Sequence, residues 1–369
     1  MAVEGVASAA ATERFRQRFA SAHPHHFRPL QDLWASSVGL GTYLGDSDDA
    51  TDARYADAIR AALSLGCNVL DTAINYRCQR SERTIGSVLN ALPAEQMSRD
   101  EMILCTKGGY LPFDGAVPRD PSRYVVETVI NPGLAEYDEL VAGCHCLTPA
   151  YLDHSLQRSL KNLRVQTIDI YYLHNPEQQL DGVDRGTFLQ RLEAAFALLE
   201  QRVRDGKIRY YGVATWQGFR CNPNARAYLS LAALVDIAER VGGATHHFRV
   251  IQLPYNLAMP EAFTFRNQTV DQTPLTILQA AEALGLSVMI SASLLQSKLV
   301  HLPPRVEASL PGLSTSAQRA IQFVRSTPGV TTALVGMKER RHVEENLALV
   351  QHPVLIPEQI RHLFDRSRR

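Results

Sequence analysis

Short apolar runs alternate with longer amphipathic segments along most of this chain, and this alternation limits the folds open to it. Short apolar runs are typical of buried strands, and apolar residues at helical spacing are typical of helices that pack on a sheet. The predicted strands span residues 38–42, 68–70, 102–106, 168–173, 210–214, 250–254, 287–290 and 331–335. The predicted helices span residues 53–65, 81–92, 149–163, 185–205, 225–241, 275–284, 314–325 and 341–350. Eight strand–helix pairs predict a closed α/β barrel, the (β/α)8 or TIM barrel.

Three glycines and two irregular segments refine this architecture. Gly66, Gly206 and Gly285 each stand just before a predicted strand, which is typical of a left-handed residue that ends a helix. Residues 27–30 and 33–35 are expected to form an N-terminal hairpin that closes one end of the barrel. Residues 108–147 make a long loop after the third strand. Such a long connection is usually functional, so a lid or substrate loop is expected.

The length alone would fit two domains, but α/β barrels of this size are often single domains. We therefore expect a tail over residues 1–26 and a single barrel domain over residues 27–369. The N-terminal segment is rich in alanine but contains acidic residues and lacks a continuous apolar core, unlike a signal peptide. An organellar transit peptide is the alternative for this segment.

Composition excludes several classes of partner. The chain is 45% hydrophobic and 21% charged, which suits a soluble protein with a large buried core. Its 38 basic and 38 acidic residues cancel, so neither nucleic acid nor a membrane surface is expected as a partner. Six scattered cysteines favour reduced thiols and a cytoplasmic location. The motif Cys144-His145-Cys146 has no second pair at zinc-site spacing, so no metal is expected.

Four ionisable side chains follow three successive predicted strands. Asp71 and Tyr76 follow the second strand, Lys107 follows the third, and His174 follows the fourth. The carboxyl ends of barrel strands meet at one face, where such enzymes keep their active sites. Each residue taken singly has an ordinary structural explanation, as a cap, a solvated lysine or a packed histidine. Their joint occurrence is what predicts an active site.

This set suits the addition of hydride to a carbonyl, which leaves an alkoxide that must be protonated. Tyr76 would donate the proton, and a nearby Lys107 ammonium would lower the pKa of its phenol from about 10. Asp71 would hold Lys107 charged and oriented, and His174 would hydrogen-bond the substrate oxygen.

Seven motifs give the chain a wider resemblance. They are GLGTYLG (39–45), DTAINY (71–76), TKGG (106–109), IDIYYLHNP (168–176), GKIRYYGVAT (206–215), IQLPYNL (251–257) and GMKERRHVEENL (336–347). In these motifs the chain resembles the aldo-keto reductase superfamily over nearly the whole barrel. The resemblance implies a (β/α)8 barrel that binds NADPH without a Rossmann fold or a metal, with Asp71, Tyr76, Lys107 and His174 as its catalytic tetrad.

The resemblance also implies cofactor-binding residues. Gln252 and Asn175 correspond to residues near the nicotinamide carboxamide, and Thr215 is the polar remnant where the family usually has Ser-Asn. Leu294 and Gln296 fall in the loop expected to contact the pyrophosphate. The adenosine-binding segment corresponds to Gly336, Met337, Lys338, His342, Glu345 and Asn346.

A basic cluster at this last segment bears on the choice of cofactor. Lys338, Arg340 and Arg341 surround a predicted helix N-terminus, which suits the 2′-phosphate of NADP. A charge run of this kind also fits an ordinary solvated helix end. NADP is therefore expected, with NAD as the alternative.

Aromatic residues on the loops are candidates for the substrate pocket, chiefly Tyr110 and Trp216, while Arg220 would meet an acidic or hydroxylated substrate. The leading hypothesis is an NADP-dependent oxidoreductase acting on an aldehyde, ketone or sugar, with Tyr76 as general acid and base. The alternative is an NADPH-binding regulatory or sensor protein of the same fold with little turnover. A sugar or polyol dehydrogenase working in the oxidative direction would use the same residues.

Overall fold

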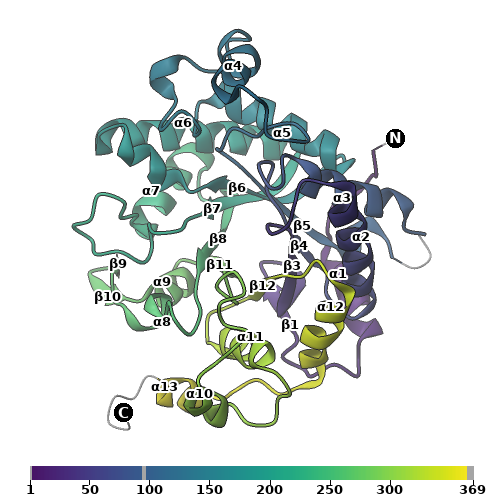
Figure 1. Ribbon diagram of the computed structural model, residues 1–369. Coiled ribbons are helices and arrows are strands. Elements are labelled where there is room, and N and C mark those ends of the chain that lie inside the picture. Colours follow the sequence, from purple (N-terminus) through teal and green to yellow (C-terminus); the bar gives the residue numbers. More distant parts are fainter. Residues whose placement is uncertain (1, 94–96, 364–369) are drawn as a thin grey trace.

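A closed barrel of parallel strands forms the centre of the computed structural model, which describes residues 2–93 and 97–363 (Figure 1). In order around the barrel the strands are β3 (Val38–Gly41), β4 (Val69–Asp71), β5 (Ile103–Gly108), β6 (Ile168–His174), β7 (Ile208–Ala214), β8 (Phe248–Pro254), β11 (Ser287–Ser291) and β12 (Thr332–Gly336). Strand β11 pairs with both β8 and β12, which closes the ring. The predicted eight-stranded barrel is confirmed.

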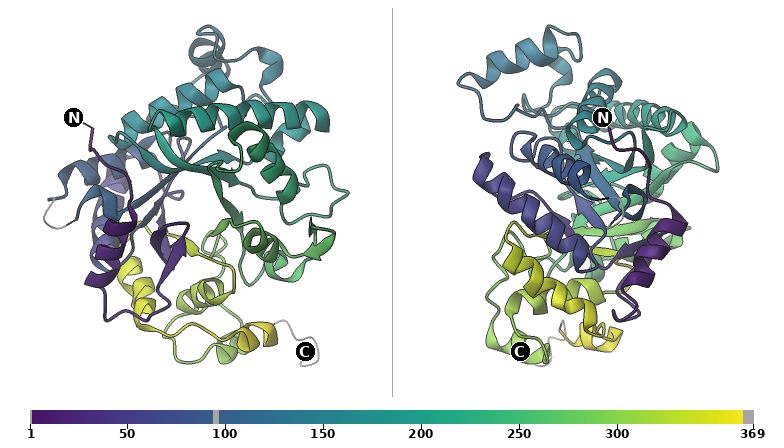
Figure 2. Two further views of the ribbon diagram at one scale, coloured as in Figure 1. Left: turned by 180° about the vertical axis from the view of Figure 1, so that it is seen from behind. Right: turned by 90° about the vertical axis from the view of Figure 1, so that its right-hand side faces the viewer.

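A helix follows each barrel strand and packs on the outside of the ring (Figures 1 and 2). These helices are α2 (Asp49–Ser64), α3 (Arg80–Ala91), α5 (Pro149–Leu163), α6 (Arg185–Arg204), α7 (Leu231–Gly242), α9 (Ile277–Ala283), α11 (Ser316–Ser326) and α12 (Arg340–Leu347). The predicted start of α7 at residue 225 is wrong. Ser230 caps the helix by accepting a hydrogen bond from the backbone N–H of Ala233.

Shorter elements lie in the connections and were not predicted. They are α4 (Pro121–Val125), α8 (Glu261–Thr264), α10 (Pro304–Ser309), α13 (Pro357–His362) and the antiparallel pair β9 (Gln268–Val270) and β10 (Thr273–Leu275). The expected left-handed glycines are confirmed, since Gly66, Gly206 and Gly285 have φ of 92°, 69° and 68°. Within the described residues, no helix is long and apolar enough to cross a membrane.

The N-terminal part of the chain closes one end of the barrel. The predicted hairpin is present as β1 (Phe27–Leu30) and β2 (Leu33–Ser36), and its Leu30 and Leu33 pack with the side chains inside the barrel. Residues 1–26, expected to be a tail, contain helix α1 (Ala9–Arg18), in which Phe15 is buried. Seen from behind in Figure 2, this purple segment lies against the barrel.

A buried ionic network ties the N-terminal segment to the barrel. Asp169 of β6 is fully buried, and its carboxylate accepts hydrogen bonds from the backbone N–H of Ala7 at 2.7 Å and of Leu104 at 2.7 Å. Arg99 adds an ion pair at 2.8 Å. One carboxylate therefore joins the N-terminal segment, β5 and β6.

We predict that Asp169→Ala lowers the free energy of unfolding by about 3–5 kcal/mol, because it leaves the buried Arg99 charge unpaired. Urea denaturation measures the loss. The matched control is Glu127→Ala, which removes the exposed Arg123–Glu127 pair and should cost far less. An equal loss in both variants would contradict the role given to Asp169.

Candidate active site

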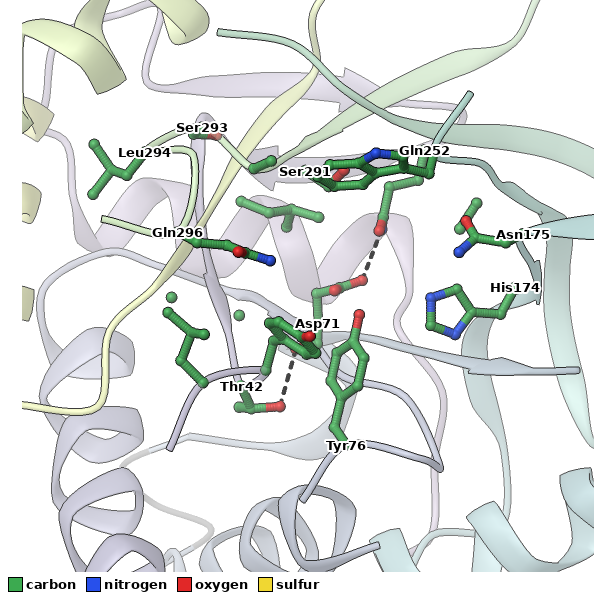
Figure 3. A pocket seen from close by; sticks show the side chains of 18 of the residues that line it. Thr42, Asp71, Tyr76, His174, Asn175, Gln252, Ser291, Ser293, Leu294 and Gln296 are labelled. Atoms are coloured by element: carbon green, nitrogen blue, oxygen red, sulfur yellow. Dashed lines mark hydrogen bonds between the residues drawn. The ribbon is translucent and has the colours of Figure 1, made fainter. Parts of the chain in front are cut away.

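A cavity of about 400 Å³ opens at the carboxyl ends of the barrel strands (Figure 3). Several of its lining residues end a strand, because parallel strands of a barrel finish at one face. The lining residues are Gly41, Thr42, Tyr43, Leu44, Asp71, Asn75, Tyr76, Tyr110, His174, Asn175, Ala214, Thr215, Trp216, Gln252, Ser291, Ala292, Ser293, Leu294, Gln296, Ser297, Leu334 and Gly336.

A buried ion pair lies beneath this cavity, and its Asp71 is part of the lining. The Nζ of Lys107 lies 2.6 Å from Oδ2 of Asp71 and donates a second hydrogen bond, of 2.8 Å, to the carbonyl oxygen of Thr72. Gln252 donates to Oδ1 of Asp71 at 2.8 Å. Burial by itself would lower the pKa of Lys107, but the charge and hydrogen bond of Asp71, together with Tyr76 and Cys105, raise it overall. Lys107 is therefore a charged ammonium, as predicted from the sequence.

Tyr76 stands over this ion pair. The Lys107 Nζ lies 5.2 Å from the centroid of its ring, and the rings of Tyr43 and His174 are 4.9 Å and 5.9 Å away. Burial raises the pKa of Tyr76, and Lys107 offsets only part of that effect. The expectation that the ammonium would lower this pKa overall is wrong for the protein alone, because burial outweighs the Lys107 charge.

The chain after Tyr76 is held by an arginine clamp. Arg77, Cys78 and Gln79 have positive φ of 49°, 54° and 69°, a conformation that costs free energy for residues other than glycine. The buried guanidinium of Arg77 donates to the carbonyl oxygen of Asp46 at 2.8 Å and to the carboxylate of Asp52 at 2.6 Å. These bonds hold the strained turn and so help to position Tyr76.

His174 is neutral at the cavity wall. Burial, together with the charge of Lys107, lowers its pKa well below the usual range. Its Nδ1 is buried and has no hydrogen-bond partner among the described residues. A buried N–H without an acceptor is rarer and costlier than a buried lone pair. We therefore assign the ring proton to Nε2, the other ring nitrogen.

The expected nicotinamide residues lie together, but all three side chains already have protein partners. Asn175, Thr215 and Gln252 all line the cavity, and Gln252 is bound to Asp71 as described above. The Thr215 hydroxyl donates to Glu177 at 2.5 Å and accepts from the N–H of Gly218 at 2.8 Å. Thr215 thus helps to shape the turn after β7. Glu177 was not predicted, although an acid just after the His174 motif was a usable signal.

The remaining predicted cofactor residues divide into two groups. Leu294, Gln296 and Gly336 line the cavity. Five lie outside its lining, on the segment that joins β12 to α12 and on α12 itself: Met337, Lys338, His342, Glu345 and Asn346.

Some of the α12 side chains have partners already. Glu345 accepts from the hydroxyl of Thr315 at 2.7 Å. Arg340 pairs with Glu344 and Asp57, so acidic residues partly neutralise the basic cluster. The cluster is therefore less strongly positive than its sequence suggests.

The predicted substrate residues differ in where they lie. Tyr110 and Trp216 line the cavity. Arg220 instead forms an ion pair with Glu261 and donates to the carbonyl oxygen of Trp216, so it is not free to meet an acidic substrate. Tyr43 was missed, although it directly follows the first barrel strand.

The long connection of residues 108–147 does not cover the cavity. Tyr110 is its one residue in the cavity lining among the described residues. Helix α4, within the connection, lies at the periphery beyond α5 and α6 (Figure 1). The expectation of a lid is wrong, because the connection packs outward against α5 (residues 149–163), where it lines a separate cavity of about 290 Å³.

Comparison with known proteins agrees with this geometry. The family model described as "Aldo/keto reductase family" matches residues 37–228, more than half of the chain. The chain belongs to the aldo/keto reductase family. Over 344 residues it is 23% identical to the uncharacterized oxidoreductase YqkF of Bacillus subtilis, covering 91% of this chain and 94% of that protein.

Two further relatives are informative. A 6-dehydroglucose reductase of Novosphingobium aromaticivorans is 29% identical over 201 residues, 52% of each chain. The aldo/keto reductase of Klebsiella pneumoniae solved in complex with NADP and acetate superposes with a TM-score of 0.61 at 22% identity, covering 90% of this chain and 92% of that chain. At this identity the superposition establishes the shared fold.

We predict that stability falls as the pH drops below about 6.5, because buried neutral histidines must be protonated on unfolding. Burial lowers the pKa of His26 to about 3 and of His145 to about 4. The unfolded chain binds more protons in this window, so each such histidine adds a slope of about 1.4 kcal/mol per pH unit. Urea denaturation between pH 7 and pH 4.5 measures the slope.

His26→Gln should reduce this slope by roughly the contribution of one histidine. The control is His301→Gln, which replaces an exposed histidine and should leave the slope unchanged. An unchanged slope in His26→Gln would contradict the effect assigned to burial.

Proposed function

We propose that this protein is an NADPH-dependent carbonyl reductase in which Tyr76 is the general acid, and the general base in the reverse direction. The observation that carries the proposal is the buried Lys107–Asp71 pair beneath Tyr76, beside a neutral His174. Bound NADPH would supply the hydride. The protein must then bind the carbonyl, exclude water and deliver one proton.

Each residue of the set has a separate task. Burial favours the protonated phenol of Tyr76, which is the form that donates a proton. The Lys107 ammonium stabilises the phenolate left behind, and Asp71 keeps that ammonium in place. His174 would donate from Nε2 to the carbonyl oxygen. Two donors then converge on the oxygen that gains negative charge.

The residues around the cavity suit NADPH. Two buried polar atoms of lining residues, Asn75 Oδ1 and Ser293 Oγ, have no hydrogen-bond partner among the described residues, so a ligand would satisfy them. Lys338 and Arg341 flank the N-terminus of α12, where no side chain caps the helix, and would receive the 2′-phosphate. The Klebsiella relative was solved with NADP, which supports the same cofactor here.

The cavity favours an uncharged substrate. No lysine or arginine occurs among the described residues that line it, so a carboxylate or phosphate on the substrate would have no counter-ion. Tyr43 and Trp216 are 51% and 39% exposed, and the amides of Asn75 and Asn175 belong to the same lining. Aromatic faces and amides suit a neutral aldehyde, ketone or sugar.

One observation favours a second candidate function, an NADPH sensor with little turnover. The hydroxyl of Thr215, expected to anchor the carboxamide, is held by Glu177 and Gly218. A loosely placed nicotinamide would bind but react slowly. Fluorescence titration with NADPH, paired with a turnover assay on neutral aldehydes, ketones and sugars, separates the two, since tight binding without turnover on any of them favours the sensor.

We predict that Tyr76→Phe lowers kcat at least about 100-fold, because the proton donor is lost. NADPH affinity should stay within about threefold of the original, since the phenol is not needed to hold the cofactor. The matched control is Tyr43→Phe, which removes the hydroxyl from the neighbouring ring and should keep most of the turnover. Full activity of Tyr76→Phe on these substrates would refute the assignment.

We also predict that Lys338→Ala weakens NADPH binding by about 10- to 100-fold, the value of a charged contact to phosphate. Binding of NADH should barely change, because NADH has no 2′-phosphate. Fluorescence titrations with the two cofactors measure the ratio. Equal losses for both cofactors would place the 2′-phosphate elsewhere.

A further inference from the structure

The two ends of the long connection form a short ribbon beside the carboxyl end of β6. Tyr110 pairs with His145 as an antiparallel bridge, flanked by hydrogen bonds of 2.8 Å from Leu111 N–H to the Cys144 carbonyl and from Cys146 N–H to the Gly109 carbonyl. We call residues 109–111 and 144–146 the stem. The rings of Tyr110 and His174 meet edge to face at 4.9 Å, so the stem touches the active site directly.

A chain of hydrogen bonds runs through the stem into the backbone of His174. Arg191 of α6 donates to Oε1 of Gln179, whose Nε2 lies 2.8 Å from Nδ1 of His145. The Nε2 of His145 lies 2.7 Å from the carbonyl oxygen of His174. Arginine can only donate hydrogen bonds, so Oε1 of Gln179 accepts. This fixes the donor and the acceptor of each following bond. Gln179 donates to Nδ1, and His145 carries its proton on Nε2 and donates it to His174.

The carbonyl of His174 needs this partner. The register between β5 and β6 ends at Gly108 and Leu173, one residue before His174. On the other side of β6, the backbone N–H of Asn175 donates to the carbonyl oxygen of Ala214 in β7. Asn175 has φ of 46°, so the chain turns away from the strand there. His145 therefore supplies the hydrogen bond that a longer β5 would have given. It is fully buried, so the bond is shielded from water.

The approach of the stem to β6 is too close for a larger residue. A Cβ on Gly109, which has φ of +135°, would lie 3.0 Å from Nε2 of His145 and 3.2 Å from the carbonyl oxygen of His174. Glycine is thus required where the stem crosses the end of β6. The second stem residue, Tyr110, accepts from the Asn175 amide at 3.1 Å and donates to Gln178. Both residues of His174-Asn175 are therefore held from the stem.

We propose that His145 is a positioning residue for the proposed reaction, holding the peptide of His174 so that its ring faces the substrate oxygen. This inference rests on the proposed function. It gives the long connection a role at the active site through its stem rather than through residues 112–143, which we call the tip. Hydride transfer is sensitive to the placement of the groups around the carbonyl, since small displacements of such groups lower rates strongly.

The test compares His145→Leu with His145→Gln. Leucine fills the space without a donor, whereas the glutamine amide still offers an N–H to the His174 carbonyl. We expect His145→Leu to lower kcat about 10- to 100-fold, with the NADPH dissociation constant within about threefold of the original. His145→Gln should restore most of kcat. A loss of kcat in both variants, or in neither, would overturn the proposal.

A matched control variant separates an effect on kcat from a loss of stability. His26 is likewise fully buried and bonds a backbone carbonyl, that of Gly66, at 2.8 Å, but it lies beside the N-terminal hairpin. His26→Leu should lower the melting temperature about as much as His145→Leu yet leave kcat nearly unchanged. An equal fall of kcat in both variants would show that His145 acts only through stability, and would overturn the proposal.

A structural readout separates this inference from the proposed function. Turnover by the wild-type protein and its loss in Tyr76→Phe test the function itself. Crystal structures of the wild type and of His145→Leu with NADPH bound test the positioning without any turnover. A displaced His174 in His145→Leu supports the inference even if no substrate is turned over, whereas an unmoved His174 overturns it even if the protein is an active reductase.

Discussion

The site depends on the buried ion pair between Lys107 and Asp71. Removing two charges from water costs several kcal/mol, and such a pair is favourable only when its other hydrogen-bonding groups are satisfied. Here Gln252 and the carbonyl of Thr72 meet that condition. The pair fixes one positive charge beneath the cavity, where it acts together with burial on the protonation of its neighbours. Burial and the ammonium both favour the neutral imidazole of His174.

Burial and charge oppose each other at Tyr76, and the outcome suits a proton donor. Burial favours the phenol, and Lys107 favours the phenolate. In the proposed reaction the phenol is the stable form at the start, which is the form able to give a proton. Once the proton has left, the same ammonium is already in place to stabilise the anion. The ammonium is already positioned when the protein folds, so no side chain has to move to stabilise the anion.

The repeated strands and helices, and the polar residues at strand ends, could be predicted from the sequence. Contacts between residues on loops could not. Eight apolar runs were enough for the barrel, and Asp71, Lys107 and His174 were found because each ends a strand. The cap at Ser230 and the alanine-rich helix α1 carry weak signals, so the start of α7 was placed too early and α1 was missed. The contacts of Glu177 with Thr215 and of His145 with His174 join residues about 30 to 40 positions apart through irregular segments. No periodicity marks such pairs, and only the folded backbone shows them.

The stem and the tip of the long connection differ in their relation to the site. The stem lies against His174, and the tip lies away from the cavity in which a substrate would bind. Its stem lies against β6 with no room for a larger residue at Gly109, whereas glycines at its tip, Gly115 and Gly133, have open space around them. The stem is therefore held closely against His174, whereas these two glycines of the tip have no close neighbour. Because the tip lies away from the cavity, the rim is left to Tyr43 and Trp216, which come from the turns after β3 and β7. In the proposed reductase, substrate choice would rest on these short turns, which are anchored to the barrel strands.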